Sequence, residues 1–340
     1  MVRPLKTINN QRRIKKMQKA KEYQTINYQS DGTIKSISEF NPTTRKLVKQ
    51  TFYQPDGTTV ESIIEFNPST VNKIKQTNFQ SDGTTVESII EFDPNTGKQV
   101  KETIFQFDGK TIDYINEFDQ TTGKKVKTIN YQSDGTIYSI IEFDPSTGKR
   151  VKATIFQQDG TTVESIIEFN PFTGEEVKTT TYQSDGKTIN FIEEFDPTTG
   201  EPVKTINYKS DGKTIKIINE YDPSTGKKVK TTDYRSDGQT IDYINEYDPK
   251  TGNKIKKTEF RSDGQAIDYI EEFNPSTGKK VKTTDYRSDG QTIDYIEEFN
   301  PETGKIIKDI FYNPDGSIRF IEEYDEDDDD HECNCEYCDQ

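Results

Sequence analysis

The sequence predicts an all-β protein of tandem β-hairpins that form one long, twisted antiparallel meander of about 24 strands, coiled into a superhelix. Three observations support this fold class. An Asp-Gly pair recurs at a nearly constant interval along the 340 residues. Each period holds two separate turn motifs. The runs between the turns are rich in Ile, Val, Thr, Tyr and Phe, which favour β-strands.

The Asp-Gly pair occurs twelve times, with a spacing of 26 residues in nine intervals and 25 in two. Both short intervals follow copies in which Thr-Ile comes directly after the Gly, so the missing residue belongs to a turn. A turn tolerates a change of length and leaves the strand pattern after it intact. The Asp residues of the twelve pairs are Asp31, Asp56, Asp82, Asp108, Asp134, Asp159, Asp185, Asp211, Asp237, Asp263, Asp289 and Asp315.

Each period contains two turns and two strands. Ser-Asp-Gly, as at 236–238, is a strong hairpin signal because Asp and Gly accept the positive φ of tight primed turns. In the second motif, Asp/Asn-Pro-x-Thr-Gly as at 222–226, Pro presets φ for a type I turn and Gly supplies the left-handed residue. Strands are predicted between the turns, as at 229–234 and 240–247.

The apolar pattern of the second strand of each period does not decide which face of that strand is buried. With the closing Phe or Tyr as reference, Ile stands three residues earlier in every copy and Ile or Val stands six earlier. Strict alternation places the aromatic and the more distant aliphatic residue on one face and the nearer Ile on the other. A β-bulge would reset that register.

Charged residues repeat with the same period. A Glu precedes the reference aromatic, as at Glu65 and Glu246, and a Lys follows the Val or Ile of the other strand, as at Lys75 and Lys256. We expect Glu and Lys to lie near each other across the Asp-Pro-x-Thr-Gly turn, in rows that are structural and solubilising.

Composition excludes several classes. Apolar residues make up 29% of the chain, charged residues 31%, and Trp is absent, so a thick conventional core is hard to build. No run approaches the roughly 18–20 apolar residues of a membrane helix. No secretory signal is recognisable, and three Cys confined to the last eight residues fit a reducing compartment. We therefore expect a cytoplasmic protein, with export to a host cell left open.

The two ends differ from the array. Residues 1–22 carry a net charge of +7 and are expected to form a basic arm or short helix before the array at 23–324. This arm is interpreted as a solvated cap on the first strand, or as a segment that touches nucleic acid, an anionic membrane or a nuclear import receptor. Residues 325–340 carry −9 and are expected to form a disordered acidic tail. Because the chain as a whole carries −15, nucleic-acid binding by the array is not expected.

The acidic tail holds the one local group of metal-ligating residues. An imidazole and three thiolates within eight residues could bind zinc or copper(I), although their spacing is not that of a standard zinc finger. The alternative is a flexible tail with incidental thiols. No other cofactor is expected. The four candidate ligands are His331, Cys333, Cys335 and Cys338.

The repeat, with its Ser-Asp-Gly-x-Thr-Ile-x-Tyr-Ile core and Asp-Pro-x-Thr-Gly-Lys-x-Val-Lys continuation, resembles a family of short repeats of unknown function in phytoplasma proteins. The resemblance covers about residues 23–324 and implies a wall-less bacterial context, but no activity. Arg45 and Val71 stand in for the turn Gly, and Gln120 replaces Pro, so looser turns are expected there. The layout is also similar, more weakly, to Tyr-Asp hairpin repeats of the Rhs type and to choline-binding hairpins, whose Trp cages this chain lacks.

Catalysis is not expected, because acid-base and nucleophilic sites need unlike groups at one unique place, whereas these residues recur copy after copy. The favoured interpretation is a non-enzymatic scaffold that binds a protein partner through repeated aromatic, aliphatic and charged rows. The alternative is a self-assembling structural protein with head-to-tail association. Calcium binding by the turn carboxylates is a weaker third candidate, since the motif lacks the dense Asp spacing of calcium loops.

Overall fold

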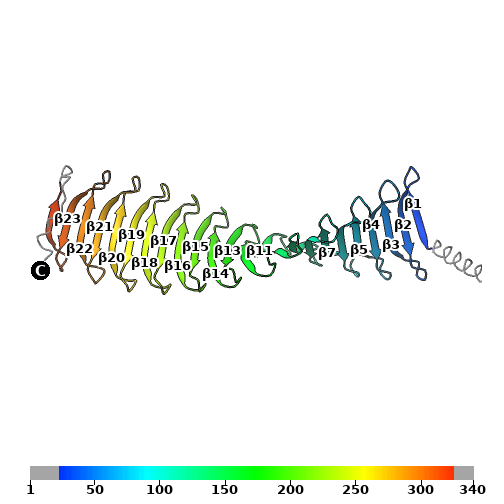
Figure 1. Ribbon diagram of the computed structural model, residues 1–340, viewed down its shortest axis with the longest axis horizontal. Helices are drawn as coiled ribbons and strands as arrows, with labels where there is room; N and C mark the ends of the chain where they lie inside the picture. Colours follow the sequence, from blue (N-terminus) through cyan, green and yellow to red (C-terminus); the bar gives the residue numbers. More distant parts are fainter. Residues whose placement is uncertain (1–22, 325–340) are drawn as a thin grey trace, which may run out of the picture. The chain divides into compact units, whose positions relative to one another are not determined.

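The structure, a computed structural model, describes residues 23–324, and these contain 24 strands joined by tight turns and no helix. The predicted all-β class and the tandem antiparallel hairpins are confirmed (Figure 1). The strands are β1 (Gln24–Tyr28), β2 (Ile34–Phe40), β3 (Leu47–Tyr53), β4 (Val60–Phe66), β5 (Lys73–Phe79), β6 (Val86–Phe92), β7 (Gln99–Phe105), β8 (Ile112–Phe118), β9 (Lys125–Tyr131), β10 (Ile137–Phe143), β11 (Arg150–Phe156), β12 (Val163–Phe169), β13 (Glu176–Tyr182), β14 (Ile189–Phe195), β15 (Pro202–Tyr208), β16 (Ile215–Tyr221), β17 (Lys228–Tyr234), β18 (Ile241–Tyr247), β19 (Lys254–Phe260), β20 (Ile267–Phe273), β21 (Lys280–Tyr286), β22 (Ile293–Phe299), β23 (Ile306–Tyr312) and β24 (Ile318–Glu323).

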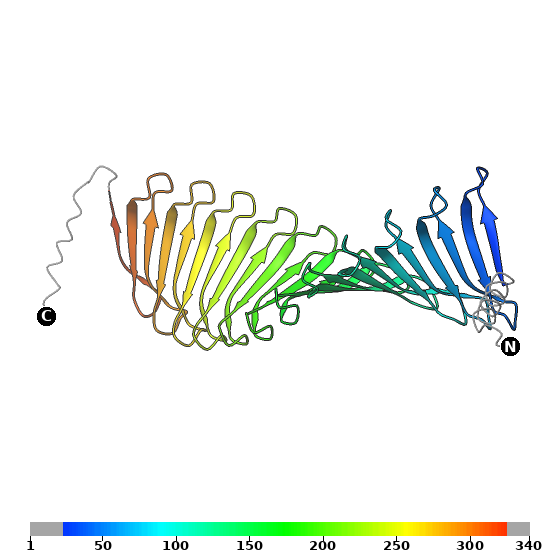
Figure 2. The same ribbon diagram turned by 45° about the vertical axis from the view of Figure 1, so that its right-hand side comes forward.

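The strands fall into two compact units, with β1–β11 in the first, β13–β24 in the second, and the boundary within β12. In the first unit each strand pairs antiparallel with the strand that follows it. The second unit repeats this meander. Figure 2 shows that strand direction turns progressively along the first unit. The predicted superhelix concerns the whole array and stays a prediction.

A β-bulge near the beginning of the strands that follow another strand sets the register, as in β18 and β19. In the pairing of β17 with β18, Asp233 lies opposite Tyr243 and Tyr234 lies opposite Ile241, so Asp242 is an extra residue without an opposite number. The pairing of β18 with β19 has the same shift at Ile255, between Lys254 and Lys256. A bulge adds one residue to one strand and shifts the alternation that follows it.

The bulge corrects the expectation of strict alternation. Residues that lie opposite each other share a face, so Ile241 shares a face with Tyr234 and Ile244 shares one with Thr232. Thr232 and Tyr234 are two apart on one strand and point the same way. Both aliphatic positions of the second strand therefore lie on one face, and the closing aromatic, Tyr247, lies on the other.

Both motifs form tight turns, but the Asp-Gly turn is not the expected primed turn, because within residues 23–324 no Asp has positive φ and only the Gly is left-handed. In the Asp-Gly turn the amide of Gly238 donates to the carbonyl of Arg235 at 3.1 Å, and Gly238 has φ of 69°. In the Asp-Pro-x-Thr-Gly turn the amide of Gly226 donates to the carbonyl of Asp222 at 2.8 Å. In the short copy at Asp134, the closing bond runs from Gln132 to the carbonyl of Thr136, which confirms that the missing residue belongs to the turn.

The expectation of looser turns at the substituted positions is wrong. Arg45 and Val71 adopt the left-handed conformation of the missing glycines, with φ of 60° and 66°. Their amides donate to the carbonyls of Asn41 and Asn67 at 2.8 Å, the distance found in the glycine-containing turns. The turn keeps its geometry, and the cost is backbone strain, which is greatest for the β-branched Val71.

Packing occurs within the sheet, because no helix or second sheet covers either face in residues 23–324. No side chain in that range is completely buried. The most buried positions are short Ser and Thr side chains in mid-strand, such as Ser36, Ser139 and Thr231, which taller neighbours shield on both sides. Residues 23–324 also lack any helix with the length and hydropathy to cross a membrane. The expected basic arm at 1–22 and acidic tail at 325–340 lie outside the described residues.

Candidate interaction face

The two faces of the sheet differ in how much their residues change between copies. On the first, here called the uniform face, each position keeps one residue type or two similar ones. In one copy its residues are Lys230, Thr232, Tyr234, Ile241, Ile244 and Glu246. Positions equivalent to Ile244 are Ile in all twelve copies, and those equivalent to Glu246 are Glu in all twelve. The other positions alternate between two residues, such as Thr and Ile at the position of Thr232 and Tyr and Phe at that of Tyr234.

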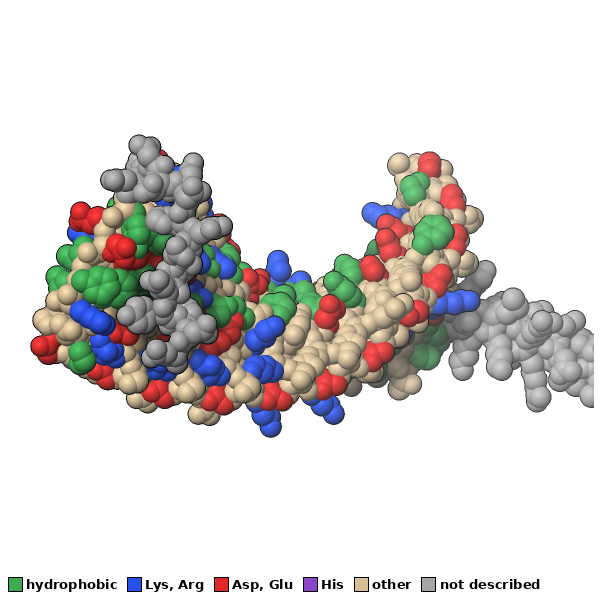
Figure 3. All heavy atoms as spheres, turned by 60° about the vertical axis from the view of Figure 1, so that its left-hand side comes forward, with side chains coloured by type: hydrophobic (Ala, Val, Ile, Leu, Met, Phe, Trp, Pro, Cys, Tyr) green, Lys and Arg blue, Asp and Glu red, His purple; other side chains and the backbone are tan. Residues whose placement is uncertain are grey.

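The Glu and Lys rows lie on the uniform face and confirm the predicted pairing across the Asp-Pro-x-Thr-Gly turn. The ammonium of Lys230 lies 3.5 Å from Glu220, and that of Lys256 lies 3.9 Å from Glu246. These side chains are about two-fifths exposed, so each pair contributes on the order of 0.5 kcal/mol. On the face that Figure 3 shows, acidic and basic side chains are interspersed.

The opposite face, here called the variable face, changes its chemistry along the chain. Its residues in the same copy are Thr231, Asp233, Tyr243, Asn245 and Tyr247. Positions equivalent to Tyr243 hold Ser, Phe, Ile or Tyr in other copies, and those equivalent to Asp233 hold Asn, Phe, Ile, Thr, Asp or Glu. Because both faces belong to the same strands, the strand and turn framework alone does not require these differences.

In the first unit the variable face is largely uncharged and mixes polar with apolar residues. The amides of Asn78 and Asn130 donate to the hydroxyls of Ser88 and Ser139 on the next strand, at 2.7 and 2.8 Å. The same bond joins Asn27 to Ser36 in the first copy, at 3.1 Å. This pair recurs in alternate copies, and Phe52, Ile104 and Ile155 occupy the position of the Asn in the copies between.

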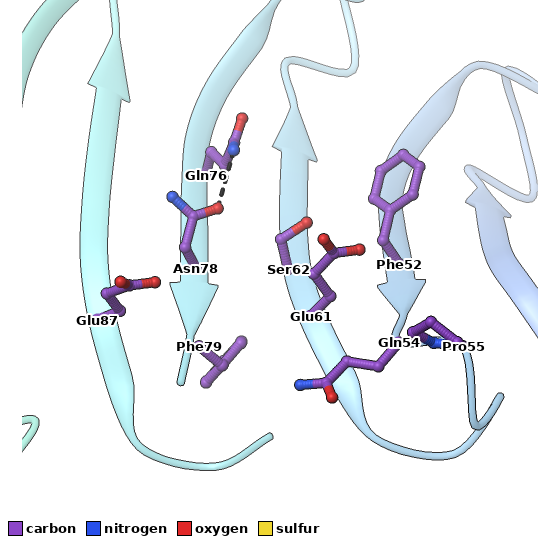
Figure 4. Close-up of a pocket in the computed structure, with 9 residues that line it drawn as sticks. All are labelled: Phe52, Gln54, Pro55, Glu61, Ser62, Gln76, Asn78, Phe79 and Glu87. Carbon is purple, nitrogen blue, oxygen red and sulfur yellow. Dashed lines mark hydrogen bonds between the residues drawn. The ribbon is translucent and has the colours of Figure 1, made fainter. Parts of the chain in front are cut away.

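A groove of about 600 Å³ opens on this face between β3 and β6 (Figure 4). Its floor is polar, and the amide of Gln76 donates to Asn78 at 2.9 Å. Two carboxylates from equivalent positions of successive copies, Glu61 and Glu87, line it together with the ring of Phe52. The full lining is Phe52, Gln54, Pro55, Glu61, Ser62, Gln76, Asn78, Phe79 and Glu87. Such a lining suits basic or amide groups beside an apolar side chain.

In the second unit the variable face carries a row of Tyr, acidic and basic side chains. Lys257 donates to the hydroxyl of Tyr269 at 2.8 Å and pairs with Glu259 at 2.9 Å. Its ammonium also lies 5.4 Å from the ring centre of Tyr243 and 5.1 Å from that of Tyr269, within cation–π range. The hydroxyl of Tyr243 donates to Asp233 at 3.3 Å. One lysine thus contacts an aromatic residue on each of the two neighbouring strands and a carboxylate on its own strand.

The titration of these groups follows their surroundings. Burial acts to lower the pKa of Lys257, but its hydrogen bonds to Tyr269 and Glu259 outweigh burial and raise it. The pKa of Tyr243 is raised by burial and by the charge of Asp233. The pKa of Asp285 is raised by burial and by the like charges of Glu297, Asp268 and Asp294. Lys257 is therefore held in its charged form by its partners, whereas the carboxylates around Asp285 repel one another.

The turn carboxylates bind their own turns. Asp237 accepts hydrogen bonds from the amides of Gln239 and Thr240 at 2.9 Å and from the hydroxyl of Thr240. These bonds, led by that from the hydroxyl, lower the pKa of Asp237 to about 2. In the part of the chain that the structure describes, no cluster of three or more His, Cys, Asp or Glu side chains is arranged to hold a metal ion.

The candidate metal ligands of the tail, His331, Cys333, Cys335 and Cys338, lie outside the described residues, and metal binding there stays a prediction. The variable face is the feature that sequence reasoning missed. Its signal was present in the differences between copies at alternate positions, but the bulge had to be known before those positions could be placed on one face.

The chain belongs to the family described as "Protein of unknown function (DUF2963)". This finding agrees with the predicted resemblance to an uncharacterised repeat family, while the phytoplasma context stays a prediction. Eleven overlapping matches cover residues 18–52, 28–78, 53–104, 79–130, 105–155, 156–207, 182–233, 208–259, 234–285, 260–310 and 286–331. No match was found among curated proteins.

Two solved structures show partial likeness to the chain. The crystal structure of TarM is 20% identical, with a TM-score of 0.24, over 33% of this chain and 20% of that one. The crystal structure of TcdB2-TccC3 is 10% identical, with a TM-score of 0.23, over 89% of this chain and 19% of that one. The chain thus spans about a fifth of each of these proteins. At such TM-scores neither likeness supports a conclusion about this protein.

Proposed function

We propose that this protein is a non-enzymatic repeat scaffold whose variable face binds a protein partner, with the uniform face serving as its structural framework. The observation that carries the proposal is the contrast between the faces. Residues equivalent to Ile244 and Glu246 repeat unchanged, whereas those opposite and beside Tyr243 differ from copy to copy.

The chemistry of the variable face suits a protein partner. Tyr and Phe supply rigid contact area with a polar edge, and Tyr is enriched at the centres of protein interfaces. Tyr243, Tyr269 and Tyr295 occupy equivalent positions of three successive copies in the second unit. A partner with matching spacing would contact several copies at once, which raises its overall affinity without any new kind of contact.

The test uses the full chain as bait in affinity capture, beside two substituted chains. The first carries Tyr243→Ser and Tyr269→Ser, which install the residue that Ser62 and Ser88 provide at equivalent positions. The second, a control on the uniform face, carries Lys230→Gln, which installs the residue that Gln24 provides. We expect a protein retained by the full chain and the control to be lost from the Tyr variant. Equal retention by all three chains would contradict a role for the variable face of the second unit.

A further inference from the structure

The outermost strands of the described array each have one paired edge. β1 pairs with β2, and β24 pairs with β23; within residues 23–324 no other strand pairs with either of them. Their outer backbone groups form a template onto which another strand can add. Strand addition at such an edge extends the sheet through the same hydrogen bonds that hold its interior.

Apolar side chains are uncovered at these edges. Ile321 of β24 is 46% exposed, whereas its equivalent one copy earlier, Ile296, is 6% exposed because strands flank it on both sides. Ile26 of β1 is 41% exposed. Both edges thus lack the neighbour that shields the same position inside the array.

The two edges are of complementary type. A strand that ends in Glu and an aromatic residue, such as β14, is followed inside the array by a strand with the pattern Lys-x-Thr or Lys-x-Ile, such as β15 with Lys204 and Ile206. β24, with Glu323 before Tyr324, is of the first type, and no strand follows it within residues 23–324. β1 is similar to the second type, with Gln24 in place of Lys and with Ile26, and no strand precedes it within that range. We infer that β24 of one chain pairs antiparallel with β1 of a second copy, so that chains associate head to tail.

An internal junction shows the side-chain pairs that such an interface would contain. β14 and β15 bring Phe191 opposite Asn207, Ile192 opposite Ile206, Glu193 opposite Thr205 and Glu194 opposite Lys204. In the same register, β24 and β1 bring Phe320 opposite Asn27, Ile321 opposite Ile26, Glu322 opposite Thr25 and Glu323 opposite Gln24. Three of these four pairs are identical to those of the internal junction, and Gln24 replaces Lys in the fourth.

Charge favours the same polarity. In this register the end of β24 lies beside the beginning of β1. The chain after Tyr324 carries −9 over residues 325–340, and the chain before Tyr23 carries +7 over residues 1–22. The negatively charged sequence that follows β24 and the positively charged sequence that precedes β1 are therefore joined to the same end of the junction. Only a parallel pairing of two β24 strands, or of two β1 strands, would bring like charges to the same end.

The experiment measures the mass of the full chain by light scattering over a hundredfold range of concentration, with three variants. The first variant is Ile26→Lys and the second is Ile321→Glu, which put an unpaired charge into the junction. The third, Phe107→Lys, replaces a turn side chain that is 89% exposed and lies away from both edges. Circular dichroism of each variant reports whether the array stays folded.

We expect the unsubstituted chain and Phe107→Lys to form species that are multiples of 39.1 kDa. Each edge variant alone should lose about tenfold or more in its association constant, because a charge is buried against Ile. Mixing the two edge variants should restore association. The carboxylate introduced at position 321 of one chain would then face the ammonium introduced at position 26 of the next across one junction, and Ile would face Ile across the other.

Several results would overturn the inference. The first is a single mass of 39.1 kDa for the unsubstituted chain at every concentration. Loss of association in only one edge variant would indicate pairing of like edges. Failure of the mixture to recover, with both variants folded, would exclude the proposed register. Association that salt abolishes, and that neither edge variant weakens, would assign it to the charged segments instead of to the strands.

Discussion

The ammonium of Lys257 donates to the hydroxyl of Tyr269 on the neighbouring strand at 2.8 Å, and it pairs with Glu259 on its own strand at 2.9 Å. Lys257 stands where Thr231 and Thr283 stand in the adjacent copies. This position of the variable face therefore holds a short hydroxyl side chain in the two adjacent copies and, here, a lysine that joins two strands.

Replacing Lys257 with Thr should lower the free energy of local opening of β19 and β20 by about 1 kcal/mol, because a hydrogen bond from a charged donor and an ion pair are both lost. Hydrogen exchange of amides in β19 and β20 measures this local opening. Lys256→Gln is the control, since the pair of Lys256 with Glu246 is longer and more exposed and should contribute about 0.5 kcal/mol or less. Equal effects of the two substitutions would contradict the special role of Lys257.

Gly109 and Gly135 have the same left-handed backbone but different surroundings. A Cβ on Gly109 would lie 2.5 Å from the Cγ2 atom of Thr85 and 3.0 Å from the amide nitrogen of Val86, whereas a Cβ on Gly135 would meet nothing within 4 Å. Gly135→Ala should cost about 1 kcal/mol for its backbone alone, and Gly109→Ala about 1 kcal/mol more for the collision. Thermal unfolding of both variants tests this order. The reverse order would mean that turns of successive copies do not pack as described.

Val71 is a β-branched residue at φ of 66°. Val71→Gly should raise stability by about 1 kcal/mol, because relief of the left-handed strain exceeds the added entropy of the unfolded chain. The reciprocal change, Gly97→Val, should destabilise the equivalent turn of the next copy. Urea unfolding measures the free energy of unfolding of both variants. A loss of stability in Val71→Gly would show that the side chain of Val71 contributes more to stability than its backbone strain costs.

Acid should destabilise the array through its turns. Hydrogen bonds led by those from Thr hydroxyls lower the pKa of Asp56, Asp82 and Asp237 from 3.8 to about 2. A group whose pKa is depressed in the folded state stabilises it above the unfolded value, and this contribution is lost as the pH falls through the folded value. The melting temperature should therefore fall between about pH 4 and pH 2. A flat profile there would contradict this account, as would an Asp237→Asn variant whose acid sensitivity is greater than that of the unsubstituted chain.

Removing a single residue should have opposite consequences in a turn and in a strand. Deleting Gln239 converts its Asp-Gly turn into the short form found after Asp31 and Asp134, so the chain should fold with little loss. Deleting Thr231 moves one part of β17 onto the opposite face, which places apolar and charged residues out of register with both neighbours. Circular dichroism and protease resistance compare the two deletions. Equal damage from both would contradict the turn assignment.

Much of the architecture could be predicted from particular residues. The Asp-Gly and Asp-Pro-x-Thr-Gly motifs placed both turns of each period, because Gly and Pro restrict φ locally and need no distant partner. The pairing of Glu246 with Lys256 followed from those turns, since a hairpin brings the residues that flank it into opposition. The left-handed turn at Val71 was not foreseen, because its closing hydrogen bond outweighs the preference of the valine backbone.

The linear order of residues was sufficient to establish repetition, strand type and the sign of the charge rows, since each depends on contacts near in the chain. The linear order was not sufficient to divide those residues between a uniform and a variable face. Asp242 has no opposite number on β17, and this one extra residue carries Ile241 to the same side as Ile244. Such a bulge arises from the pairing of two backbones, and the residues of either strand alone do not encode it unambiguously.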